Sequence, residues 1–160
     1  MYGSIAFTDS YEKSKRKWYR LHKLCTTGRS YGMKNKHSFQ RRLEETEQSK
    51  HDSSFPRDYR QYKALKCGRY LVSIQGSRGH YCTPRETIGA NEYFSMEIAI
   101  FPRYTRNKHV FLNVNRSKKL KAFPRISELM ERADGTQPTV FGYVPVDLIQ
   151  DLINYMEEKK

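Results

Sequence analysis

The sequence lacks the features that define a membrane protein or a disulfide-bonded scaffold. Hydrophobic residues make up 37% of the 160 positions, and the mean hydropathy is -0.88. No apolar run approaches the roughly 20 residues that a membrane-spanning helix needs, and no signal-peptide core precedes the cysteines. The three cysteines, Cys25, Cys67 and Cys82, cannot all pair within the chain. We therefore expect reduced thiols, no contact with membranes and a cytoplasmic location.

Signatures of common catalytic and nucleotide-binding classes are absent as well. The sequence contains no G-x-x-x-x-G-K-[ST], no G-x-G-x-x-G, no H-E-x-x-H, no H-x-E followed by P-C-x-x-C and no G-x-S-x-G. The segment Gly76-Ser-Arg-Gly79 has no helix predicted after it, so it indicates a turn and not a phosphate loop. We therefore expect neither a cofactor nor a metal.

Positive charge is what the sequence has in excess, and its distribution is uneven. The chain contains 30 Lys and Arg against 17 Asp and Glu, a formal net charge of +13. Counted along the sequence, residues 1–67 hold 16 basic and 7 acidic residues, and residues 103–125 hold 8 basic residues and no acid. The sign of the charge reverses over residues 126–158, which hold 7 acidic residues and a single basic one, Arg132. Because such a surplus is costly in self-repulsion, it favours a polyanionic partner.

Apolar residues are sparse before Cys67 and dense from Tyr70 to Met156. This contrast predicts a basic, partly ordered N-terminal extension over residues 1–67, with one or two helices, and a core domain over residues 68–160.

Residue periodicity predicts an α+β fold. Alternating apolar and polar residues indicate strands at 70–75, 93–101, 109–115 and 139–144. Helical spacing and capping residues indicate helices at 11–25, 39–48, 124–132 and 145–156, with loops or linkers at 26–38, 49–57 and 76–91. The order of the core elements predicts an antiparallel or mixed sheet of about four strands with helices on one face.

Two sets of apolar positions mark the expected core. In the strand 93–101, Phe94, Met96, Ile98 and Ile100 fall on one side. In the last helix, the apolar stripe consists of Leu148, Ile149, Leu152, Ile153 and Met156.

Basic residues interleaved with aromatic ones are the candidate binding residues. Guanidinium and ammonium groups hold phosphates, and aromatic faces stack on unpaired bases. The candidates are Lys13, Arg16, Lys17, Trp18, Tyr19, Arg20, Lys23, Arg29, Arg57, Arg60, Arg103, Arg106, Lys118 and Lys119. For the N-terminal segment, the alternative is a solvated charged helix whose Trp18 packs on the core. A hairpin of strands 93–101 and 109–115 would separate the basic blocks 103–109 and 116–121, so no continuous patch is predicted.

Two further arrangements remain open. A metal-free ribonuclease needs a base, an acid and a cation beside the phosphate, which Glu97, His109 and Arg103 or Arg106 would supply, with His80 and Tyr81 in the nearby loop. A zinc site would combine His22 and Cys25 with His80 and Cys82, although neither pair has C-x-x-C spacing.

Three segments between Tyr70 and Met156 resemble small proteins carried by bacteriophages and mobile elements. They are Ile74-Gln-Gly-Ser77, His80-Tyr-Cys-Thr-Pro-Arg-Glu86 and Phe141-Gly-Tyr-Val-Pro-Val146. Among the proteins that it resembles, anti-CRISPR inhibitors best suit a short, basic chain with no catalytic signature. The resemblance implies binding to a guide-RNA-loaded effector nuclease inside a bacterial host cell. Many anti-CRISPRs are acidic mimics of DNA, and this basic chain departs from them, which favours contact with guide RNA or with an acidic protein surface beside it.

These observations predict a non-catalytic binding protein that engages RNA or a ribonucleoprotein, with an anti-CRISPR-type inhibitor of a CRISPR effector as the particular case. The alternatives are a small toxin-like ribonuclease and an RNA-binding structural component of a ribonucleoprotein.

Overall fold

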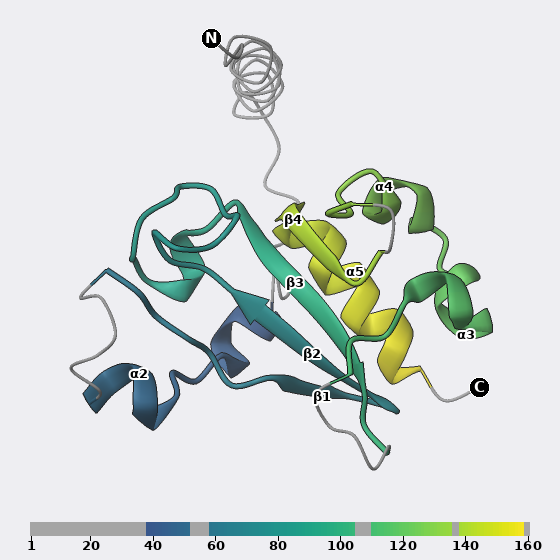
Figure 1. The fold of residues 1–160 in the computed structure, drawn as a ribbon, viewed down its shortest axis with the longest axis horizontal. Helices are drawn as coiled ribbons and strands as arrows, with labels where there is room; N and C mark the ends of the chain where they lie inside the picture. The colour runs from purple at the N-terminus through teal and green to yellow at the C-terminus, as the bar shows by residue number, and fades with distance from the viewer. Residues whose placement is uncertain (1–37, 52–57, 105–109, 136–137, 159–160) are drawn as a thin grey trace, which may run out of the picture. The chain divides into compact units, whose positions relative to one another are not determined.

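A four-stranded antiparallel sheet is the framework of the described part of the chain (Figure 1). The computed structural model describes residues 38–51, 58–104, 110–135 and 138–158. The strands are β1 (Leu65–Cys67), β2 (Tyr70–Gln75), β3 (Ser95–Pro102) and β4 (Val140–Pro145), and they lie in that order across the sheet. The helices that accompany them confirm the predicted α+β class. The predicted helix at 11–25 lies outside the described residues.

Alternation along β2 and β3 gives the sheet an apolar face. Val72 lies opposite Ile100, and Ile74 lies opposite Ile98. All four side chains are fully buried, and each contributes about 1.5–3 kcal/mol by leaving water. Phe94 departs from the expected pattern, because it precedes the strand and is 51% exposed.

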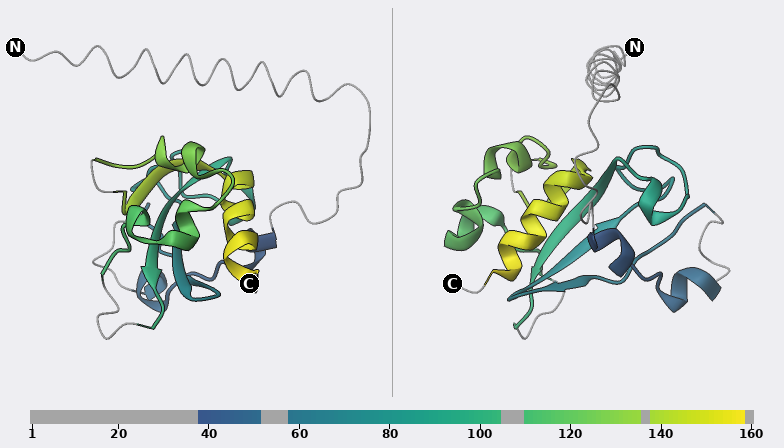
Figure 2. Two further views of the ribbon diagram at one scale, coloured as in Figure 1. Left: turned by 90° about the vertical axis from the view of Figure 1, so that its right-hand side faces the viewer. Right: turned by 180° about the vertical axis from the view of Figure 1, so that it is seen from behind.

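Helix α5 (Val146–Glu157) covers this apolar face, as the view from behind shows (Figure 2). It follows β4 directly, and it contacts both β4 and β1. Its buried side chains are those of the predicted stripe: Leu148, Ile149, Leu152, Ile153 and Met156. The prediction of this helix and of its buried face is confirmed.

Short helical segments complete the described fold. They are η1 (Ser38–Arg42), α2 (Glu47–His51), η2 (Ala90–Glu92), η3 (Val114–Arg116), α3 (Lys118–Lys121) and α4 (Ile126–Met130). The predicted helix at 124–132 corresponds to α4, whereas α3 was not predicted. Ser117 explains α3, because its side chain accepts a hydrogen bond from the Leu120 amide and thereby caps the first turn.

The predicted single helix at 39–48 is wrong, because the chain leaves the helical conformation between η1 and α2. The Thr46 amide donates to the Gln61 carbonyl at 2.8 Å, and the Lys63 amide donates to the Glu44 carbonyl at 2.8 Å. These bonds form a β-bridge between Glu45 and Tyr62. Pairing with a distant segment therefore overrides the local helical preference.

The predicted strand at 109–115 is also wrong over the residues that the structure describes. Residues 110–113 form no strand, and η3 follows them. The position beside β3 belongs instead to β4, which pairs with it as far as Ala99 and Val140. Beyond that pair, the Leu112 amide donates to the Ile100 carbonyl at 2.8 Å.

The core also includes residues from the segment that was predicted to be an extension. Phe39, Tyr62, Leu65 and Cys67 are all buried in it. Cys67 pairs with Tyr70, so the predicted boundary between residues 67 and 68 falls inside the turn of the β1–β2 hairpin. The described part of residues 38–67 thus belongs to the same packed unit as the sheet.

Candidate nucleic-acid interface

The turn between β1 and β2 lies against the C-terminal end of α5. Gly68 in this turn has φ +58°, a conformation that residues with a side chain rarely adopt. A Cβ atom on Gly68 would lie 2.5 Å from the carbonyl oxygen of Met156. Glycine is therefore required here both by its conformation and by the close approach of the helix backbone.

Two basic side chains from distant segments converge on this contact. Arg103 Nη1 donates to the Gly68 carbonyl at 3.2 Å, and the Arg103 amide donates to the Arg69 carbonyl at 3.0 Å. Lys119 Nζ donates to the Met156 carbonyl at 3.2 Å and to the Glu158 carbonyl at 3.1 Å. Because Gly68 touches Met156, Arg103 and Lys119 lie at the same end of the fold.

A side-chain hydrogen bond brings α3 to this end as well. The Tyr70 hydroxyl lies 3.1 Å from Ser117 Oγ, and Tyr70 is the β-sheet partner of Pro102. The expectation that the basic blocks on either side of residues 109–115 lie at opposite ends of a hairpin is therefore wrong. Residues 110–116 do not run away from residue 103 as a strand, so Arg103 lies at the same end of the fold as Lys118 and Lys119.

We call this surface the basic pole and define it by Lys66, Arg69, Arg103, Lys118 and Lys119. Lys66, Arg69 and Lys118 are exposed, and Arg103 and Lys119 are partly exposed. The acidic side chains of the nearby helix end are Glu157 and Glu158, and Glu157 pairs with Arg42 at 2.9 Å. Cations therefore outnumber carboxylates at the basic pole.

The basic residues of the pole differ in the contacts and the exposure of their side chains. Lys119 satisfies carbonyl groups at the end of α5, where the helix dipole is negative. Lys66, Arg69 and Lys118 extend into solvent and are the cations most accessible to a polyanion. Lys119 therefore positions the surface, and the exposed three define its charge.

Exposed aromatic side chains adjoin the basic pole. Tyr104 is 77% exposed, and the Arg103 guanidinium carbon lies 5.1 Å from its ring centroid. Phe111 is 47% exposed and packs on Phe101, with ring centroids 4.9 Å apart. The surface thus offers cations suited to phosphates and flat rings suited to bases.

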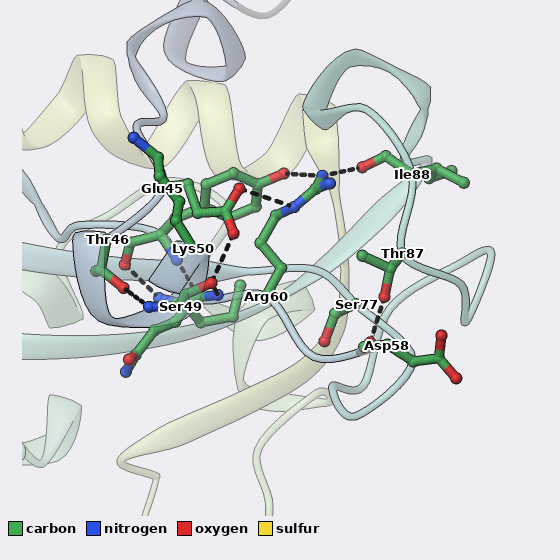
Figure 3. Close-up of polar contacts among 12 residues, drawn as sticks. Glu45, Thr46, Ser49, Lys50, Asp58, Arg60, Ser77, Thr87 and Ile88 are labelled. Carbon is green, nitrogen blue, oxygen red and sulfur yellow. Dashed lines mark hydrogen bonds and ion pairs between the residues drawn. The ribbon is translucent and has the colours of Figure 1, made fainter. Parts of the chain in front are cut away.

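Arg60, another predicted binding residue, lies in a network of internal polar contacts (Figure 3). Its Nη1 donates to the Ile88 carbonyl at 2.5 Å and to the Tyr62 hydroxyl at 3.2 Å, and its Nε lies 3.4 Å from Glu45 Oε2. Thr87 Oγ1 also donates to the Asp58 carbonyl. The guanidinium of Arg60 thus ties the loop after β2 to the segment before β1.

The remaining predicted binding residues lie outside the described residues, and their binding role stays a prediction. They are Lys13, Arg16, Lys17, Trp18, Tyr19, Arg20, Lys23, Arg29, Arg57 and Arg106. The sequence reasoning missed Lys66, Arg69, Tyr104 and Phe111. For Lys66 and Arg69, the available signal was a basic residue on each side of the Cys67-Gly68 turn.

The predicted ribonuclease residues are not gathered at one place among the described residues. Arg103 follows the end of β3, whereas Glu97 lies six positions earlier, about 20 Å away along an extended strand. The Tyr81 amide donates to Glu97 Oε2 at 3.1 Å. His109 lies outside the described residues. A phosphate held by Arg103 is thus out of reach of Glu97.

His80 has the environment of a structural histidine. It is 6% exposed, its Nδ1 lies 2.7 Å from Ser77 Oγ, and its ring packs on Tyr59 with centroids 4.8 Å apart. Burial lowers the pKa of His80, and the Glu97 carboxylate opposes this shift. The imidazole is therefore favoured in its neutral form inside the turn.

The described half of the predicted zinc site does not form a ligand cluster. Cys82 Sγ lies 3.2 Å from the Ser77 carbonyl oxygen, and burial raises the pKa of this thiol. Among the described residues, no group of three or more His, Cys, Asp or Glu side chains is placed to hold a metal ion. His22 and Cys25 lie outside them.

Comparison with protein-family models, with curated proteins and with solved structures finds no match to this chain. Within the described ranges, no helix combines the length and the apolar character needed to cross a bilayer. The candidate function therefore rests on the geometry and charge of the basic pole.

Proposed function

We propose that the chain is a non-catalytic RNA-binding protein whose basic pole holds the phosphate backbone. One observation carries the proposal: the Gly68–Met156 contact and the Tyr70–Ser117 hydrogen bond gather cations from three separate segments. Clustered cations of this kind gain affinity for nucleic acid through the release of counterions. The basic residues between Lys13 and Arg29 add positive charge that favours the same kind of partner.

The target that we propose is the RNA of a ribonucleoprotein, with the guide RNA of a CRISPR effector nuclease as the particular case. The resemblance to anti-CRISPR proteins supports this choice, and so does the net charge of +13. Recovery of one nuclease complex with its guide RNA, when the chain is purified from its host, is the expected result. Sedimentation with a ribosomal subunit would favour a structural ribonucleoprotein component instead.

Fluorescence anisotropy with a labelled single-stranded RNA of about 16 nucleotides tests the role of the basic pole. The test variant combines Lys66→Ala, Arg69→Ala and Lys118→Ala. The control variant combines Lys50→Ala, Arg78→Ala and Arg132→Ala, which remove the same charge from exposed positions elsewhere. We expect the test variant to bind at least tenfold more weakly than the control variant. Equal losses in the two variants would contradict a localised site.

The integrity of the RNA after incubation in EDTA tests the non-catalytic assignment. We expect full-length RNA on a denaturing gel after incubation with the wild-type chain. Metal-free cleavage that His109→Ala abolishes would overturn the assignment and favour the ribonuclease.

A further inference from the structure

We infer that the basic pole selects single-stranded over duplex RNA, because unpaired bases stack on Phe111 and Tyr104. This inference rests on the proposed RNA-binding function and specifies the form of RNA that is bound. It follows from the position of the exposed aromatic side chains relative to the cations.

The exposed large hydrophobic side chains of the described residues form two groups, one at each end of β3. Tyr81 and Phe94 lie at the end where β3 begins, together with Glu97. Tyr104, Val110 and Phe111 lie at the end where β3 finishes. This second group is the one that adjoins the basic pole, since Arg103 immediately precedes Tyr104.

Phe111 is held in place before any ligand binds. Its ring packs on Phe101 at 4.9 Å with 33° between the ring planes, and the next residue, Leu112, is hydrogen-bonded through its amide to the Ile100 carbonyl. The side chain nevertheless remains 47% exposed. A ring that is fixed on one side and accessible to solvent on the other is a stacking platform with little conformational entropy to lose.

Tyr104 places a ring and a cation side by side. The Arg103 guanidinium lies over the Tyr104 ring at 5.1 Å, and the tyrosine is still 77% exposed. A nucleotide at this position meets a phosphate-binding group and an aromatic surface together. The flanking cations make a polyanion the complementary occupant of these rings, in preference to an apolar protein surface.

The preference for single-stranded over duplex RNA follows from the accessibility of the bases. In a duplex the base faces are stacked on one another and cannot reach protein aromatics, whereas in a single strand they can. Each stacked base raises affinity by about 5- to 150-fold, and this gain is available only to the single strand. The cations contribute to both forms because both carry phosphates.

The test compares Phe111→Leu and Tyr104→Leu with Phe94→Leu, which removes an exposed aromatic ring from the opposite end of β3. Each variant is titrated with a single-stranded RNA and with the duplex of the same sequence. We expect the first two variants to bind the single strand at least fivefold more weakly, with a change below twofold for the duplex. We expect Phe94→Leu to change neither affinity, and equal melting temperatures to show that each variant is folded.

A fluorescent base reports stacking directly. Single-stranded RNA that carries 2-aminopurine should lose emission on binding the wild-type chain and should keep it with the Phe111→Leu, Tyr104→Leu double variant. Unchanged single-strand preference and unchanged quenching in the double variant would overturn the stacking inference. The proposed RNA-binding function would survive failure of the stacking inference if the charge variant Lys66→Ala, Arg69→Ala, Lys118→Ala still loses affinity. Absence of RNA binding by the wild-type chain would refute both the RNA-binding function and the stacking inference.

Discussion

Gly68 lies directly against the backbone of Met156, so that a Cβ atom on Gly68 would stand 2.5 Å from the Met156 carbonyl oxygen. The contact joins the β1–β2 turn to the end of α5. It also sets the position of Arg103, which binds the Gly68 carbonyl, relative to Lys119, which binds the Met156 carbonyl. The packing of one glycine thus determines the spacing of cations on the surface.

Substitution of this glycine tests the contact. We expect Gly68→Ala to lower the free energy of unfolding by about 3 kcal/mol or more, because the left-handed conformation and the clash with the helix backbone add. Urea denaturation measures the loss. Gly135→Ala is the matched control: Gly135 has φ +75° but nothing within 4 Å of the added Cβ, so only about 1–2 kcal/mol is expected. Equal losses would show that Met156 does not constrain the turn.

Lys118 and Lys119 are adjacent but differ in exposure and in the contacts that their side chains make. We expect Lys119→Ala to lower the free energy of unfolding by about 1–2 kcal/mol, because two carbonyl groups at the end of α5 lose their donor. Lys118→Ala should change it by less than about 0.5 kcal/mol, since its side chain is exposed. Thermal or chemical denaturation distinguishes the two. A larger stability loss for Lys118→Ala than for Lys119→Ala would contradict a structural role for Lys119.

The side chain of Gln75 makes the two hydrogen bonds to the Tyr62 backbone that a neighbouring strand would otherwise make. Its Oε1 accepts from the Tyr62 amide at 2.8 Å, and its Nε2 donates to the Tyr62 carbonyl at 2.9 Å. We expect Gln75→Leu to cost about 2–4 kcal/mol, because two buried backbone groups lose their partners. Hydrogen exchange at the Tyr62 amide should become faster in the variant. Unchanged exchange at that amide would contradict the interpretation.

The protein should become less stable at alkaline pH because of two buried groups, the Cys67 thiol and the Tyr93 hydroxyl. Burial, followed by the nearby Glu157 carboxylate, raises the pKa of Cys67 from 9.0 to about 11. Burial likewise raises the pKa of Tyr93 from 10.0 to about 12. Because both pKa values are higher in the folded state, their contribution is complete below pH 9 and is lost between pH 9 and 12.

Cys67→Ala separates the two contributions. The variant should retain only the decline between pH 10 and 12 that Tyr93 causes, whereas the wild-type chain should already lose stability between pH 9 and 11. Denaturation midpoints at a series of pH values provide the comparison. Parallel curves for the two proteins would show that the Cys67 thiol does not contribute.

Much of the fold was predictable wherever periodicity and burial agree. The stripe on α5 and the alternation in β2 are confirmed because each has one face on the core. Residues 110–114 show why the same signal fails elsewhere. Val110 and Val114 have the spacing of residues on one face of a strand, but Val110 is 54% exposed. In addition, β4 occupies the edge of β3 with which this segment would have to pair. Strand β1 was missed because three residues are too short to show a period.

The sequence predicted part of the candidate site, namely Arg103, Lys118 and Lys119, but not its arrangement. Charge alone does not reveal that Arg60 is held by Glu45 and Ile88, or that Lys119 is held by the end of α5. These partners come from segments far away in the sequence. The convergence of Arg69, Arg103 and Lys118 likewise depends on the long-range contacts of Gly68 and Tyr70, which leave no local signal.

The salt dependence of RNA affinity tests the central claim most directly. Each phosphate contact on a single strand contributes about 0.7 to the slope of log affinity against log salt concentration. The combined variant Lys66→Ala, Arg69→Ala, Lys118→Ala should therefore lower the magnitude of the slope by about 2, while the control Lys50→Ala, Arg78→Ala, Arg132→Ala should leave it unchanged. An unchanged slope for the first variant, or the same decrease in both, would contradict a phosphate-binding site at the basic pole.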